Sequence, residues 1–71
     1  MSEAEFGRQY FSVFGVAKDA VASNVLAVCR QEKIDDRVAA KIVAAAQMSV
    51  EQTATNTYAS MWGTVQKFFR K

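Results

Sequence analysis

The segment Lys33-Ile34-Asp35-Asp36 contains the clearest helix boundary in this 71-residue sequence. Asp35 is a favourable N-cap residue, because its carboxylate can accept hydrogen bonds from the unpaired backbone N–H groups at the start of a helix. Asp36 would then lie in the first turn, where the helix dipole stabilises a negative charge. The segment therefore predicts that one helix ends and another begins here.

Before this boundary the pattern predicts two helical segments. Ser2 and Glu5 form a capping box, and apolar side chains follow it at the three- and four-residue spacing of one helix face. These side chains are Phe6, Tyr10, Val13, Phe14 and Ala17. A second run extends from Asp19 to Lys33. The break near Gly15–Asp19 is weak, because a glycine inside a helix costs only about 1 kcal/mol relative to alanine. A single long, bent helix is therefore an alternative.

After the boundary the pattern predicts two more helices. The segment from Asp36 to Ala46 is rich in alanine, and small residues let helix axes approach closely. Ser49 and Gln52 form a second capping box, which predicts a turn before a last helix from Val50 toward Lys71. We therefore expect an all-α protein, a compact bundle of about four helices that forms a single domain over residues 1–71.

Composition excludes several kinds of chemistry. The sequence has no histidine, so histidine bases and histidine metal ligands are absent. Its one cysteine, Cys29, lies among apolar residues and is expected to be buried and inert. Most carboxylates fall at expected helix ends, where capping and the helix dipole explain them. We therefore expect no enzyme activity, no catalytic residue, no metal site and no cofactor.

Charge is distributed unevenly along the chain. Residues 1–36 carry four basic and six acidic side chains, whereas residues 37–71 carry five basic and one acidic. Such asymmetry favours a surface that faces a polyanion, although a solvated surface with a basic tail explains it equally well. The acidic start is unlike a signal peptide, and no uncharged apolar run approaches about 18 residues. The expectation is a cytoplasmic protein without a membrane partner.

One stretch resembles a known DNA-binding unit. Residues 45–56, Ala45-Ala46-Gln47-Met48-Ser49-Val50-Glu51-Gln52-Thr53-Ala54-Thr55-Asn56, are similar to the helix-turn-helix of Cro-type phage and plasmid repressors, within a match from about Lys41 to Ser60. Ser49 stands where that family usually has glycine, and Thr55 where it usually has valine or isoleucine. The resemblance implies a helix-turn-helix in the C-terminal half, with its recognition helix in the major groove of double-stranded DNA. It also implies that the protein is a transcriptional regulator that binds an operator sequence. The DNA-binding residues it implies are Lys41, Glu51, Gln52, Thr53, Asn56, Thr57 and Ser60. The alternative interpretation of this stretch is an ordinary helical hairpin with a capped turn.

Aromatic residues gather in the first and last predicted helices. Hydrophobic residues make up 51% of the chain. One interpretation is that the terminal helices pack on each other and fill the core with aromatic rings. One helix pair is not expected to bury all of these rings, so we also expect a homodimer, or another protein partner, at these helices. The interface residues expected are Phe6, Tyr10, Phe14, Trp62, Phe68 and Phe69. The alternative to DNA binding is a small helical adaptor or inhibitor that binds another protein through this aromatic surface. In size and in its tryptophan-containing basic end, the chain is loosely similar to the Hha family of nucleoid-protein modulators.

Overall fold

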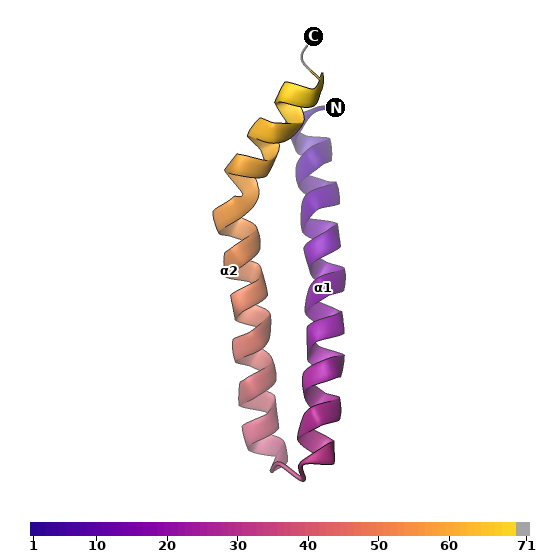
Figure 1. The fold of residues 1–71 in the computed structure, drawn as a ribbon, viewed down its shortest axis with the longest axis vertical. Coiled ribbons are helices and arrows are strands. Elements are labelled where there is room, and N and C mark those ends of the chain that lie inside the picture. The colour runs from indigo at the N-terminus through magenta and orange to yellow at the C-terminus, as the bar shows by residue number, and fades with distance from the viewer. Residues whose placement is uncertain (70–71) are drawn as a thin grey trace.

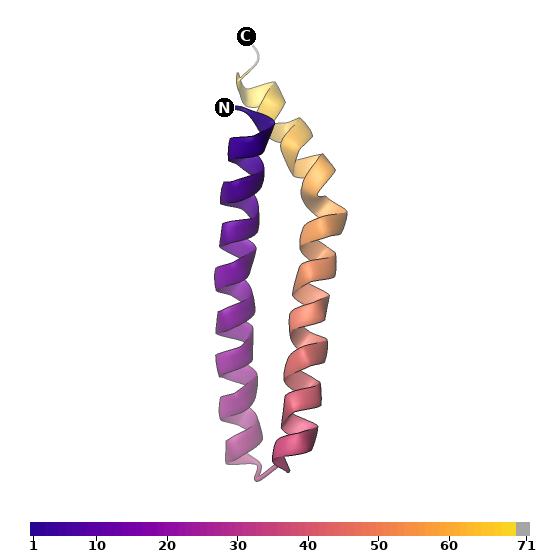
Figure 2. The ribbon, with the colours of Figure 1, turned by 180° about the vertical axis from the view of Figure 1, so that it is seen from behind.

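The chain forms an antiparallel hairpin of two long helices. The structure is a computed structural model that describes residues 1–69. Helix α1 spans Glu3–Gln31 and helix α2 spans Asp36–Phe69. Figures 1 and 2 show the two helices side by side, joined at one end, with the last part of α2 leaning toward the start of α1. The prediction of a four-helix bundle is therefore wrong.

The connection between the helices is a short turn that closes α1 in a Schellman motif. The N–H of Ile34 donates to the carbonyl of Cys29 at 2.8 Å, and the N–H of Lys33 donates to that of Arg30 at 3.2 Å. Lys33 adopts the left-handed conformation that this motif requires, with φ of 55°. Asp35 then caps α2, because its Oδ1 accepts from the N–H of Arg37 at 2.9 Å. The helix boundary expected at residues 33–36 is confirmed.

Two other expected boundaries are absent, because each helix continues through them. Ser2 caps α1 as expected, accepting from the N–H of Glu5 at 3.1 Å, but the helix then passes through residues 15–19 without a break. In α2, Ser49 does not cap a new helix. Its hydroxyl donates to the carbonyl of Ala45 at 3.0 Å, as serine does inside a continuous helix. The turn of the expected helix-turn-helix is therefore missing, and residues 45–56 are helical throughout.

The hairpin is long and thin, with principal extents of 55 × 16 × 15 Å. Its inward stripe on α1 includes Phe6, Tyr10 and Cys29, and on α2 it includes Ala39 and Ala54. These five are the only buried residues among residues 1–69, and even Phe6 and Tyr10 keep 8% and 9% of their surface exposed. The larger core cluster lies at the end where the termini meet, and the turn end holds Cys29 and Ala39. The core is therefore a seam between two helices, which leaves the outer faces of both helices uncovered.

Candidate functional site

The open end of the hairpin is held together by aromatic side chains. Phe6, Tyr10 and Ala54 are buried there, and four half-buried side chains pack around them. These four are Phe14, Tyr58, Trp62 and Val65. The ring of Phe6 lies 5.2 Å from that of Trp62 and 5.6 Å from that of Tyr58, centroid to centroid. Such pairs add to the stability that burial alone provides, so this end of the hairpin is its most firmly packed part.

A hydrogen-bonded tyrosine fixes the register of the two helices at this end. The hydroxyl of Tyr10 donates to the carbonyl of Ala54 at 2.8 Å and lies 2.6 Å from Oγ1 of Thr57. Tyr58 faces the same cluster, and partial burial, aided by the nearby Glu3 carboxylate, raises the pKa of its hydroxyl above the ordinary value of 10.0. The carboxylate of Glu3 is therefore a negative charge close to the aromatic cluster.

Beyond this cluster, apolar side chains remain exposed at the end of α2. Phe68 is 77% exposed and Phe69 is 71% exposed. A hollow of about 200 Å³ is lined by Met1, Trp62, Val65, Gln66 and Phe69, whereas Phe68 lines a separate hollow with Thr64 and Lys67. We call Phe68 together with the residues that line the first of these hollows the aromatic end. Lys67 lies in the last turn of α2 and gives this surface a positive charge.

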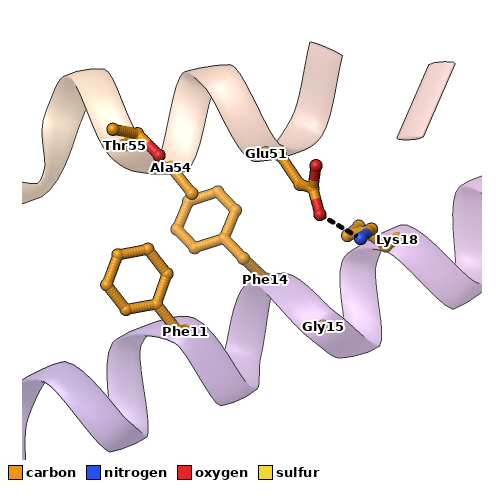
Figure 3. A pocket seen from close by; sticks show the side chains of 7 residues that line it. All are labelled: Phe11, Phe14, Gly15, Lys18, Glu51, Ala54 and Thr55. Carbon is orange, nitrogen blue, oxygen red and sulfur yellow. Dashed lines mark hydrogen bonds and ion pairs between the residues drawn. The ribbon is translucent and has the colours of Figure 1, made fainter. Parts of the chain in front are cut away.

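Another hollow, of about 320 Å³, lies farther along the hairpin between α1 and α2. Figure 3 shows the rings of Phe11 and Phe14 rising from α1 toward α2, and Lys18 paired with Glu51 at one end of the hollow. The ion pair is exposed, so its contribution to stability is small. Lys18 and Glu51 place both charges of this pair on one long side of the hairpin, which we call the charged side.

A further hollow, of about 400 Å³, lies near the turn and has an apolar lining. It is lined by Asn24, Val25, Val28, Cys29, Ile34 and Ile42. Cys29 is free, and only 3% of it is exposed, as expected from its apolar neighbours in the sequence. Val28 and Ile42, by contrast, are 55% and 40% exposed. The hollow is therefore an open apolar surface with the thiol at its base.

The residues expected to bind DNA lie along the middle of α2. Lys41, Gln52, Thr53, Asn56, Thr57 and Ser60 are exposed, and so is Glu51, which pairs with Lys18. Thr57 also contacts the hydroxyl of Tyr10. A recognition helix presents its N-terminal residues to the bases, whereas these residues follow several turns of unbroken helix. DNA binding stays a prediction, and its expected helix-turn-helix geometry is corrected.

The residues expected at a dimer or partner interface divide into two groups. Phe6 and Tyr10 are buried within the hairpin itself, and Phe14 and Trp62 pack against them. Phe68 and Phe69 are exposed and available to a partner. The contact between Tyr10 and Ala54 could not be predicted from the sequence. The four-residue spacing of the aromatic residues in both terminal segments does, however, indicate an aromatic stripe on each of two helices that could face each other.

Comparison with known proteins adds no assignment. No protein family matches the sequence, and neither a curated protein nor a solved structure is similar to it. By length and composition alone, α1 is apolar enough to cross a membrane, a test that core helices of soluble proteins and signal sequences also pass. Within residues 1–69 no three His, Cys, Asp or Glu side chains gather in a way that suits a metal ion.

Proposed function

We propose that this chain is a small adaptor that acts by binding another protein at its aromatic end. The observation that carries the proposal is the exposure of Phe69 at the hollow that Trp62 lines, with the exposed Phe68 on the neighbouring face beside Thr64 and Lys67. Phenylalanine, tryptophan and methionine are enriched at protein interfaces, and a shallow hollow with aromatic walls can accept an apolar side chain from a partner. The aromatic end therefore has the chemistry of a contact surface.

Charge around the aromatic end favours a particular partner. Lys67 precedes the two phenylalanines, and Arg70 and Lys71 follow them in the sequence. An apolar protein segment flanked by aspartate or glutamate would match both features, because its apolar residues would enter the hollow and its carboxylates would meet the cations. We therefore propose an apolar protein segment with flanking acidic residues as the partner.

Selection from a displayed library of 12- to 16-residue peptides, a length set by about three to four helical turns, tests this proposal. Binding of selected peptides is then titrated by the fluorescence of Trp62, the only tryptophan in the chain. The expected peptides carry apolar residues next to acidic ones and shift the Trp62 emission. The double variant Phe68→Ser/Phe69→Ser should weaken binding by about 100-fold or more, because each buried phenylalanine contributes about 1.5–3 kcal/mol.

Met48→Ser is the matched control, because Met48 is an apolar side chain 58% exposed on the middle of α2. This control should bind the peptides as the unchanged chain does. The proposal fails if no peptide is selected, or if the double variant binds as tightly as the control. Binding to phosphatidylserine-containing vesicles without binding to any peptide would assign the aromatic end to a membrane instead.

A further inference from the structure

The surface of the hairpin is too large for a chain of this mass. Its accessible surface is 5652 Å², whereas a compact monomer of 7.9 kDa exposes about 4,400 Å². The radius of gyration also shows an elongated molecule, since it is 16.1 Å, whereas a compact domain of 71 residues has about 11 Å. The excess, roughly 1,200 Å², is larger than the roughly 800 Å² that each partner contributes to a standard interface.

Part of this uncovered surface lies on one long side of the hairpin, where the exposed side chains named below are apolar or uncharged. We call this side the neutral face. On α1 it contains Val13, Val16, Ala20, Asn24 and Val28, and on α2 it contains Ile42, Ser49, Thr53 and Thr57. Val13 and Val16 are 66% and 69% exposed, so the hairpin itself does not cover them. A solvated helix face of this length ordinarily carries lysine and glutamate.

Helix geometry separates the neutral face from the charged side. Residues two apart in a helix point about 200° apart. Val16 is therefore turned away from Lys18, and Thr53 is turned away from Glu51, which pairs with Lys18 on the charged side. Asn24, Val28 and Ile42 line one hollow together, which shows that the two helices contribute to the same side near the turn.

Two of the three hydroxyl groups of the neutral face, those of Ser49 and Thr57, already have partners inside the hairpin. Ser49 donates to the carbonyl of Ala45 at 3.0 Å, and Thr57 lies 2.8 Å from the carbonyl of Thr53 and 2.6 Å from the hydroxyl of Tyr10. A buried polar group is unfavourable chiefly when it lacks a hydrogen bond. These side chains can therefore be covered by another helix without losing their hydrogen bonds.

We infer that a second copy of this chain covers the neutral face and that the two hairpins form a four-helix dimer. A twofold axis brings the same surface of both copies together, so a face with charges of one sign would repel itself and an uncharged face does not. Two packed hairpins supply the four helices around one core that form a stable bundle. This interface differs from the aromatic end, so the dimer and the proposed adaptor can be tested separately.

Sedimentation velocity of the purified chain and three variants tests this inference. The unchanged chain should sediment with about twice its 7.9 kDa mass. Thr53→Lys and Val16→Lys should each raise the dimer dissociation constant by about 100-fold or more, because placing like charges together costs several kcal/mol. Thr55→Lys is the matched control, since Thr55 lies on the same helix and lines the hollow on the charged side.

The control should remain dimeric, and its circular dichroism should show the helix content of the unchanged chain. A monomeric unchanged chain at about 100 µM overturns the inference, since a stable interface of this size binds well below that concentration. A dimer that survives both lysine substitutions, or that the control also loses, overturns it as well. A chain that is monomeric in buffer and sediments with phosphatidylcholine vesicles would assign the neutral face to lipid.

Discussion

Replacing Tyr10 by phenylalanine should destabilise the hairpin by the value of one hydrogen-bonded hydroxyl. Tyr10 is 9% exposed, and its hydroxyl donates to the carbonyl of Ala54 at 2.8 Å. The substitution leaves the ring contacts in place, including the 4.9 Å centroid distance to Phe14. Thr57 keeps the carbonyl of Thr53 as an acceptor, so no buried hydroxyl is left without a partner. We therefore expect a loss of about 1 kcal/mol, in the middle of the range for a neutral hydrogen bond.

The assay is thermal and urea unfolding followed by circular dichroism at one fixed protein concentration, because a dimer makes Tm depend on concentration. A loss of this size lowers Tm by about 4–8 °C in a domain of this length. Tyr58→Phe is the control, because the Tyr58 hydroxyl lies beside Gly7 and hydrogen-bonds to none of the described residues. It should change the free energy of unfolding by less than about 0.5 kcal/mol. Equal losses in the two variants would refute the assignment of Tyr10 as the residue that fixes the register.

Three further substitutions test the local structure. Lys33→Gly should stabilise the chain by about 1 kcal/mol, because the left-handed backbone at φ of 55° strains every residue with a Cβ, and Lys33→Ala, measured in the same urea titration, should give no such gain. Gly15→Ala should raise the free energy of unfolding by about 1 kcal/mol, because its new Cβ meets no atom within 4 Å; a loss of stability would show that α1 is broken at this point. Because the pKa of Tyr58 is raised in the folded chain, the unfolded chain loses this proton first, and the free energy of unfolding should fall above pH 10. Unfolding experiments at pH 7 and pH 10.5 should show a smaller loss of stability in Tyr58→Phe than in the unchanged chain. The same loss in both proteins would contradict this prediction.

The helix ends that a side chain caps directly could be predicted from the sequence. Ser2 and Asp35 both accept backbone N–H groups where the pattern placed them. The breaks expected near Gly15 and at Ser49 were wrong for a physical reason. One glycine weakens a long helix without ending it, and a serine hydroxyl can bond to the preceding turn as readily as it can cap a new helix. Neither break contains proline, which the sequence lacks.

The site was harder to predict than the helices, because it depends on contacts between distant parts of the chain. The aromatic residues were expected to lie at an interface, but spacing along one helix does not show which helix covers its apolar face. Tyr10 meets residues 44 and 47 positions away, and only the pairing of α1 with α2 brings them together. The Lys18–Glu51 pair, which identifies the charged side, depends on the same pairing.

Small-angle X-ray scattering of the unchanged chain tests most directly whether two hairpins pack side by side through their neutral faces. Such packing predicts a particle of about twice the 7.9 kDa chain mass whose longest dimension remains close to the 55 Å of one hairpin. A particle of 7.9 kDa with a radius of gyration of 16.1 Å would show a lone hairpin and contradict this packing. A particle of twice the mass but about twice the length would also contradict it, because that shape requires contact between the ends of the hairpins.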